Sequence, residues 1–88
     1  MNFQVVVDRE PQDYLRKLDN SVRLRILKKL VQLKRDDLNL RHLRHGLKHH
    51  VGEVGGYRIA LLQDENAKTR TIVFIGNHEE YEKWLWEQ

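Results

Sequence analysis

The sequence predicts an α+β protein in which two N-terminal helices pack on an antiparallel sheet of about four strands, followed by a short C-terminal helix. Apolar residues recur at helical spacing between residues 14 and 33, whereas apolar runs of strand length separated by turn residues recur between residues 51 and 76. Helices followed by a run of strands are typical of α+β domains with antiparallel sheets. The 88 residues suffice for one domain with a thin core, which we expect to span residues 1–88.

The N-terminal segment is expected to form a strand and then a helix. Three consecutive valines favour a strand over Phe3–Val7. Asp8 or Glu10 can cap the following helix, and Pro11 fits its first turn because the missing N–H costs nothing there. The apolar stripe of this helix contains Tyr14, Leu15 and Leu18.

The second helix has the most regular apolar pattern of the chain. Residues 19–21 form a break in which each residue can cap a helix, and we expect the helix to end near residues 35–37. The short connection predicts an antiparallel helical hairpin that lays one apolar face on a sheet. That face contains Val22, Ile26, Leu30 and Leu33, with Leu27 and Val31 widening it.

The C-terminal half is expected to consist mainly of strands. Leu38–His50 is expected to be a turn or loop, because Gly46 and four histidines weaken its leucine spacing. The elements that follow are a strand at Val51–Val54, a turn at Gly55-Gly56, a central strand at Tyr57–Gln63, a hairpin loop at Asp64–Lys68, a strand at Thr69–Gly76, and a helix from His78 to about Trp86 capped by Asn77.

Arg58 is the residue that the central strand does not explain. A guanidinium group is almost never fully buried unless it is paired, and it cannot lose its charge. We therefore expect one of two arrangements: Arg58 pairs with a carboxylate, for which Glu53 is the candidate, or its strand faces a groove where an anion binds.

Basic residues are concentrated in the middle of the chain. The net charge is +3, and residues 23–50 contain nine Lys and Arg against two Asp. A basic middle indicates a polyanionic partner, and a solvated helix face is the alternative interpretation.

A hairpin of residues 57–63 and 70–76 would bring Arg58 and His78 toward the same edge of the sheet, within reach of Lys48, His49 and His50. Phosphodiester transfer needs such groups, because an arginine neutralises the charge that builds on phosphorus and a histidine moves a proton. The 2′-hydroxyl of RNA would supply the nucleophile without a metal. The alternative is that Arg58 forms the ion pair described above and that His78 only opens a helix.

Two other groups of residues are candidates for chemistry. The histidines of residues 42–50 lack cysteines and a carboxylate at a matching offset, so we predict no metal site and no cofactor. The terminal rings of Tyr81, Trp84 and Trp86 can stack on RNA bases or pack the last helix on the sheet. We expect Trp84 to pack, and Tyr81, one turn after His78, to face the site.

The chain resembles the RelE/ParE superfamily, the small toxins of type II toxin–antitoxin modules, over nearly its whole length. The resemblance rests on the element order, on the leucine-rich basic second helix, and on three motifs whose order and spacing match. These motifs are Leu43-Arg44-His45-Gly46, Gly56-Tyr57-Arg58-Ile59 and Gly76-Asn77-His78-Glu79-Glu80-Tyr81.

The resemblance implies a RelE-like, microbial RNase-like fold and a metal-independent endoribonuclease that cuts mRNA on the ribosome and leaves a 2′,3′-cyclic phosphate. In that interpretation Arg58 stabilises the transition state, His78 is the general acid or base, and Tyr81 stacks on or orients a nucleotide. Lys48, with His49 or His50, adds positive charge beside the phosphate.

The same resemblance implies the partners. A cognate antitoxin would wrap the protein and mediate most of its oligomerisation, and mRNA and ribosomal RNA would be bound in the cytoplasm, with no membrane association. The residues expected to bind RNA are Arg23, Lys28, Lys29, Arg35, Arg41, Arg44, His49 and His50.

Two alternative functions remain within the same fold. One is a ParE-like inhibitor of DNA gyrase, which binds and does not cleave. The other is an interaction protein without catalysis, which would suit the acidic Glu79 and Glu80 at positions where many family members carry Arg or Lys.

Overall fold

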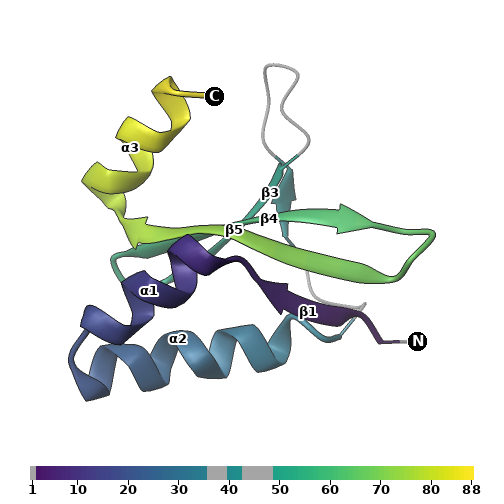
Figure 1. The fold of residues 1–88 in the computed structure, drawn as a ribbon, viewed down its shortest axis with the longest axis horizontal. Coiled ribbons are helices and arrows are strands. Elements are labelled where there is room, and N and C mark those ends of the chain that lie inside the picture. The colour runs from purple at the N-terminus through teal and green to yellow at the C-terminus, as the bar shows by residue number, and fades with distance from the viewer. Residues whose placement is uncertain (1, 36–39, 43–48) are drawn as a thin grey trace.

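The computed structural model describes residues 2–35, 40–42 and 49–88, and these form a mixed sheet with three helices (Figure 1). The expected Leu43–Gly46 turn and Lys48 lie outside the described residues. The elements in chain order are β1 (Gln4–Val7), α1 (Arg9–Lys17), α2 (Asn20–Gln32), β2 (Arg41–His42), β3 (His49–Val54), β4 (Tyr57–Asp64), β5 (Thr69–Asn77) and α3 (His78–Trp86). The predicted α+β fold class is confirmed.

Within the described residues the sheet has the strand order β1-β5-β4-β3-β2. Strands β3 to β5 pair antiparallel, as the sequence predicted, and β2, in a segment expected to be a turn or loop, pairs antiparallel with β3. Strand β1, however, runs parallel to β5. This corrects the expectation of a purely antiparallel sheet. The chain passes through the α1–α2 hairpin and strands β2 to β4 before β5 returns beside β1 in the same direction (Figure 1).

The core lies between α1, α2 and one face of the sheet. Helix side chains including Leu15 and Ile26 pack there against strand side chains including Ile59 and Ile72. Burying each aliphatic side chain of this kind contributes roughly 1.5–3 kcal/mol, so these few contacts dominate the stability of a small domain. Helix α3 rises from the end of β5 on the side away from α1 and α2 (Figure 1).

Two predictions about individual positions were wrong. Leu27 and Val31 do not extend the core face of α2, because their residues are 39% and 63% exposed. His49 and His50 are not in a loop, because they begin β3 and pair with Leu62 and Leu61 of the long strand β4. No helix among the described residues is long and apolar enough to cross a membrane.

The last helix starts where the sequence predicted, and the reason is local. The side chain of Asn77 accepts a hydrogen bond from the N–H of Glu80, and the side chain of Glu80 accepts one from the N–H of Asn77. This reciprocal capping box satisfies two N–H groups that a helix start leaves without partners. It fixes the direction in which His78 leaves the sheet.

Candidate functional site

Arg58 and His78 are brought to one end of the sheet by the register of three strands. Arg58 of β4 lies opposite Gly76 of β5 and opposite Glu53 of β3. His78 follows Gly76 by two residues and opens α3. The prediction that the hairpin sets residue 58 opposite residues 75–76 is therefore confirmed. Gly76 also lets the chain pass closely, because a Cβ there would lie 2.5 Å from the ring of Phe74.

The ion pair between Arg58 and Glu53, one of the two arrangements expected for Arg58, is present. The Nε atom of Arg58 lies 3.6 Å from Oε1 of Glu53, and the two side chains are 18% and 46% exposed. Ion pairs with a half-exposed partner contribute only about 0–1 kcal/mol. Such a pair holds the guanidinium in place. Because the pair is weak, a phosphate that displaces the carboxylate of Glu53 from Arg58 loses little free energy in doing so.

His78 also has an acidic neighbour. Its Nε2 lies 3.5 Å from Oε1 of Glu82, one turn further along α3, and both side chains are more than half exposed. An exposed i,i+4 contact on a helix is weak, about 0.3–0.5 kcal/mol. The imidazole is therefore available to solvent and to a ligand.

Tyr81 is buried in an aromatic cluster under α3. Its residue is 6% exposed, and its ring centroid lies 6.2 Å from that of Phe74 and 6.1 Å from that of Trp84. Trp84 in turn stacks on Phe74 with centroids 5.1 Å apart. The ring face of Tyr81 is thus not offered to a nucleotide base in this structure. The exposed ring is Trp86, at 88%.

The two histidines of β3 point to opposite faces of the sheet, because successive strand residues alternate. His49 packs edge-on against Trp84, with ring centroids 5.0 Å apart. Burial lowers the pKa of His49 below its ordinary value of about 6.5. Its buried Nδ1 has no hydrogen-bond partner among the described residues. In this conformation His49 is neutral near pH 7 and adds no positive charge.

The basic residues expected to bind RNA occupy different environments. Arg23 makes its hydrogen bonds within the chain. Its guanidinium donates to the backbone carbonyls of Leu15, Arg16 and Leu18 and to the side chain of Asn20. Lys29 lies against the sheet, with its Cε 3.3 Å from the position of a Cβ at Gly52. Lys28 and Arg35 are exposed. Arg44, Lys48 and the side chain of Arg41 lie outside the described residues.

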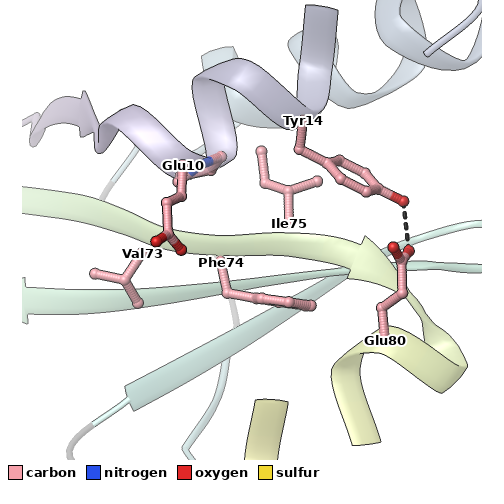
Figure 2. A pocket seen from close by; sticks show the side chains of 7 residues that line it. Glu10, Tyr14, Val73, Phe74, Ile75 and Glu80 are labelled. Carbon is pink, nitrogen blue, oxygen red and sulfur yellow. Dashed lines mark hydrogen bonds between the residues drawn. The ribbon is translucent and has the colours of Figure 1, made fainter. Parts of the chain in front are cut away.

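The contact between Tyr14 and Glu80 was not predicted from the sequence. The hydroxyl of Tyr14 donates to Oε1 of Glu80 at 2.6 Å, and the two residues line a cavity of about 160 Å³ with Glu10, Phe74 and others (Figure 2). Burial, assisted by the carboxylate of Glu80, raises the pKa of Tyr14. Glu80 is therefore turned toward α1, and this contact ties α1 to the helix that carries His78.

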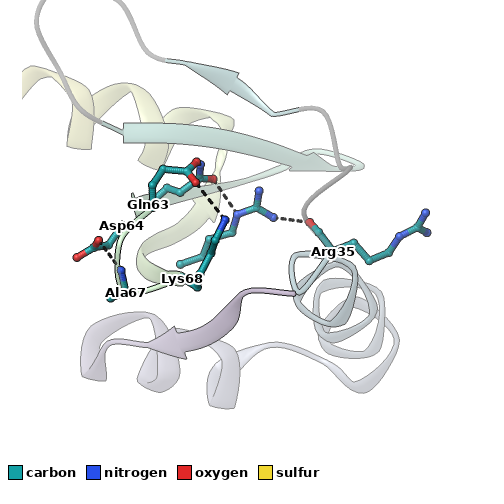
Figure 3. Close-up of polar contacts among 7 residues, drawn as sticks. Arg35, Gln63, Asp64, Ala67 and Lys68 are labelled. Atoms are coloured by element: carbon teal, nitrogen blue, oxygen red, sulfur yellow. Dashed lines mark hydrogen bonds and ion pairs between the residues drawn. The ribbon is translucent and has the colours of Figure 1, made fainter. Parts of the chain in front are cut away.

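Arg70 is the second residue whose contacts were not predicted from the sequence. It is 3% exposed and lies 4.0 Å over the ring of Phe3. Its guanidinium donates to the side chain of Gln63 and to the carbonyls of Leu33 and Arg35, whose own side chain points away from this contact (Figure 3). A charged residue inside a β-branched strand was the available signal, and it is the same signal that singled out Arg58.

No protein-family model matches the sequence, and no curated protein matches it significantly. Solved structures do match. The RelBE2 toxin–antitoxin complex of Mycobacterium tuberculosis has a chain with TM-score 0.80 and 18% identity, covering 89% of this chain and 100% of that one. A doubly substituted E. coli toxin RelE in the free state gives TM-score 0.75 and 23% identity, covering 97% and 93%. The RelE–RelB complex of Pyrococcus horikoshii gives 0.71 and 17%, covering 88% and 96%.

Proposed function

We propose that this chain, which has the fold of the RelE toxins, is the toxin of a type II toxin–antitoxin pair and cleaves mRNA on the ribosome. The observation that carries the proposal is the placement of Arg58 and His78 at one end of the sheet by strand register and helix capping. The similarity to toxins solved alone and with their antitoxins supports the same assignment and a protein antitoxin as the partner.

The reaction that these residues suit is transesterification within the RNA strand. The 2′-oxygen attacks the adjacent phosphorus, the bond from phosphorus to the 5′-oxygen breaks, and the products are a 2′,3′-cyclic phosphate and a 5′-hydroxyl. His78 moves a proton, either from the 2′-hydroxyl or to the departing 5′-oxygen. Arg58 neutralises the extra negative charge on the phosphoryl oxygens in the transition state.

The remaining site residues act around this pair. Tyr81 holds α3 on the sheet, and through it the backbone that carries His78, because its ring packs with Phe74 and Trp84. Lys48 supplies further positive charge near the phosphate, whereas His50 lies on the face of the sheet that Gly52 turns toward α2. The exposed cations of the chain contact ribosomal RNA, whose phosphates attract Lys and Arg without regard to sequence.

Glu53 is the residue that regulates access to Arg58 in this mechanism. A phosphate must displace its carboxylate from the guanidinium before Arg58 can act. Replacing Glu53 by Gln removes the competing charge and keeps the shape, so cleavage should increase by about two- to fivefold, the equivalent of the weak pair that is lost. A decrease would mean that Glu53 positions Arg58 and does not compete for it.

The test is induction in cells that lack the antitoxin, with mapping of mRNA 5′ ends on ribosomes. The wild type should arrest growth and create new ends inside reading frames, and Arg58→Ala and His78→Ala should not. Arg16→Ala is the control, because it also removes an arginine that pairs with a carboxylate, here with Asp13 at the surface of α1. An inactive wild type, with mRNA intact, would refute the nuclease.

A second candidate is an interaction protein without catalysis, and the observation in its favour is that Arg58 and His78 each have a carboxylate neighbour. The same assay separates the two functions. A chain that forms a complex with an antitoxin but leaves mRNA intact, even as Glu53→Gln, would be such a protein. Inhibition of supercoiling by purified gyrase would instead indicate the ParE-like alternative.

A further inference from the structure

One carboxylate oxygen joins three elements beside the candidate site. Oε1 of Glu80 accepts the hydroxyl of Tyr14 at 2.6 Å and the backbone N–H of Asn77 at 2.8 Å. Tyr14 belongs to α1, Asn77 ends β5, and Glu80 lies in the first turn of α3 (Figure 2). The carboxylate therefore connects α1 with the start of the helix that carries His78.

His78 lies inside the segment that these hydrogen bonds close. It is flanked by Asn77 and Glu80, which form the reciprocal capping box. The first turn of α3 also lies close on the strand, because a Cβ at Gly76 would be 3.0 Å from the Cβ of Glu80. Gly76 is in turn the partner of Arg58 in the sheet. The orientation of this turn thus sets the position of the His78 backbone relative to Arg58.

The capping box alone leaves this turn free to move, because it is exposed. Both of its hydrogen bonds lie at the surface, where water competes for the same groups. The cavity of about 160 Å³ also adjoins Glu80 (Figure 2). A cavity of this size has ample space for water. Without a further contact, the carboxylate could turn into the cavity, be hydrated there and release the N–H of Asn77.

The hydroxyl of Tyr14 opposes that movement. The ring of Tyr14 packs against the core, so its hydroxyl is held by a fixed side chain. The hydrogen bond to Glu80 is partly buried, and a bond to a charged acceptor is stronger there than in water. Burial, assisted by the carboxylate, raises the pKa of Tyr14, so the phenol keeps the proton that it donates throughout the neutral range.

We propose that Tyr14 is a positioning residue for His78. By holding Glu80 in the orientation that caps α3, its hydroxyl keeps the imidazole at the place from which it moves a proton. This inference rests on the proposed function, in which His78 is the general acid or base. Displacing a catalytic group by about 1 Å can lower a rate by about 10²-fold. Loss of the hydroxyl should therefore slow the chemical step and leave RNA binding unchanged.

The experiment compares Tyr14→Phe with the wild type in cleavage of ribosome-bound mRNA by the purified chain. Tyr14→Phe should lower kcat by at least about tenfold and change KM by less than about twofold. Ile26→Val is the matched control, because it removes one buried methyl group on α2 and so weakens the fold by a similar small amount. With the folded fraction of both variants measured by circular dichroism, Ile26→Val should retain the kcat of the wild type.

Variants of Glu80 show whether Tyr14 acts through this carboxylate. Glu80→Ala should lower kcat at least as much as Tyr14→Phe does. The double variant should be no slower than Glu80→Ala alone, because both changes break the same series of contacts. Glu80→Gln should retain more of the rate than Glu80→Ala, since its amide oxygen can accept both hydrogen bonds and Gln suits a capping box. Effects that multiply in the double variant, a wild-type kcat for Tyr14→Phe, or a loss confined to KM would overturn the proposal.

NMR of the folded chain tests the positioning without RNA. In Tyr14→Phe, hydrogen exchange of the Asn77 and Glu80 amides should accelerate by at least about tenfold, and the imidazole signals of His78 should shift. In Ile26→Val these amides should change no more than the rest of the chain. If the wild type leaves mRNA intact, the proposed nuclease fails, and these signals alone decide the positioning: unchanged signals overturn it and changed signals support it. If the wild type cleaves mRNA and Tyr14→Phe alters neither the signals nor kcat, only the positioning inference fails.

Discussion

Replacing Tyr14 by Phe should weaken the fold by about 1–2 kcal/mol, because it deletes a single hydroxyl that donates to a carboxylate. The Tyr14 hydroxyl lies 2.6 Å from Oε1 of Glu80 in a partly buried contact. A hydrogen bond to a charged group contributes roughly 1.5–3 kcal/mol when buried, and partial exposure reduces that figure. For a domain of this size the loss corresponds to a fall in Tm of about 4–16 °C.

The same contact predicts how stability depends on pH. Burial, the hydrogen bond to Glu80 and its negative charge all raise the pKa of Tyr14 in the folded state. An unfolded tyrosine ionises near pH 10, so the contribution of Tyr14 is fully present below about pH 10. Above it the unfolded chain releases a proton that the folded chain retains, and stability falls by about 1.4 kcal/mol per pH unit until the folded pKa is reached.

Urea unfolding followed by circular dichroism, near pH 7 and above about pH 10, measures both effects. Near pH 7 the matched control is Tyr57→Phe, because no hydrogen bond to the Tyr57 hydroxyl occurs within the described part of the chain. Tyr57→Phe should cost less than about 0.5 kcal/mol. Above about pH 10 the comparison uses only the wild type and Tyr14→Phe, because Tyr57 also raises the pKa of Tyr14. The advantage of the wild type over Tyr14→Phe should shrink above pH 10. Equal losses in the two variants near pH 7, or a gap that does not narrow with pH, would refute the reasoning.

Three further predictions concern stability and titration. Arg70→Met should cost about 3 kcal/mol or more in urea unfolding, because buried carbonyls lose their donor, whereas Arg16→Met, at the surface, should cost less than about 0.5 kcal/mol. Gly55→Ala should lower the free energy of unfolding by about 1–2 kcal/mol, because Gly55 has φ +56°. Gly56→Ala should lower it less, because nothing lies within 4 Å of the new Cβ. By NMR, His49 should titrate below about pH 6.5, because burial lowers its pKa in the folded state. The stability that its neutral form contributes should be lost as pH falls through this folded pKa. A midpoint above about pH 6.5 would contradict its burial.

Local signals predicted the elements of this fold well. Helix α3 begins at the predicted residue because its capping box is encoded within four positions, Asn77 to Glu80. The direction of β1 was not predictable in this way. Its partner β5 lies more than sixty residues away, and an alternating or β-branched pattern is the same for a parallel and an antiparallel neighbour. The exposure of Leu27 and Val31 was missed because a widened stripe is compatible with either a broad core face or a second, outward face.

The candidate site shows the same division between local and distant information. The register that sets Arg58 opposite Gly76 follows from a short hairpin, so a count along the sequence was enough to predict it. The burial of Tyr81 was not predictable, because it depends on Phe74 and Trp84 closing around the ring. Contacts between side chains distant in sequence, such as that of Tyr14 with Glu80, have no periodic signal at all.

Part of the negative charge of the C-terminal helix is engaged in contacts within the chain. Glu80 caps α3 and accepts the hydroxyl of Tyr14, so its charge is directed toward α1. Glu82 lies 3.5 Å from the imidazole of His78 in an exposed contact that contributes little free energy. Glu53 contacts Arg58 through a weak pair that a phosphate can displace. In the proposed mechanism, replacing Glu53 should therefore change the rate of cleavage without unfolding the chain.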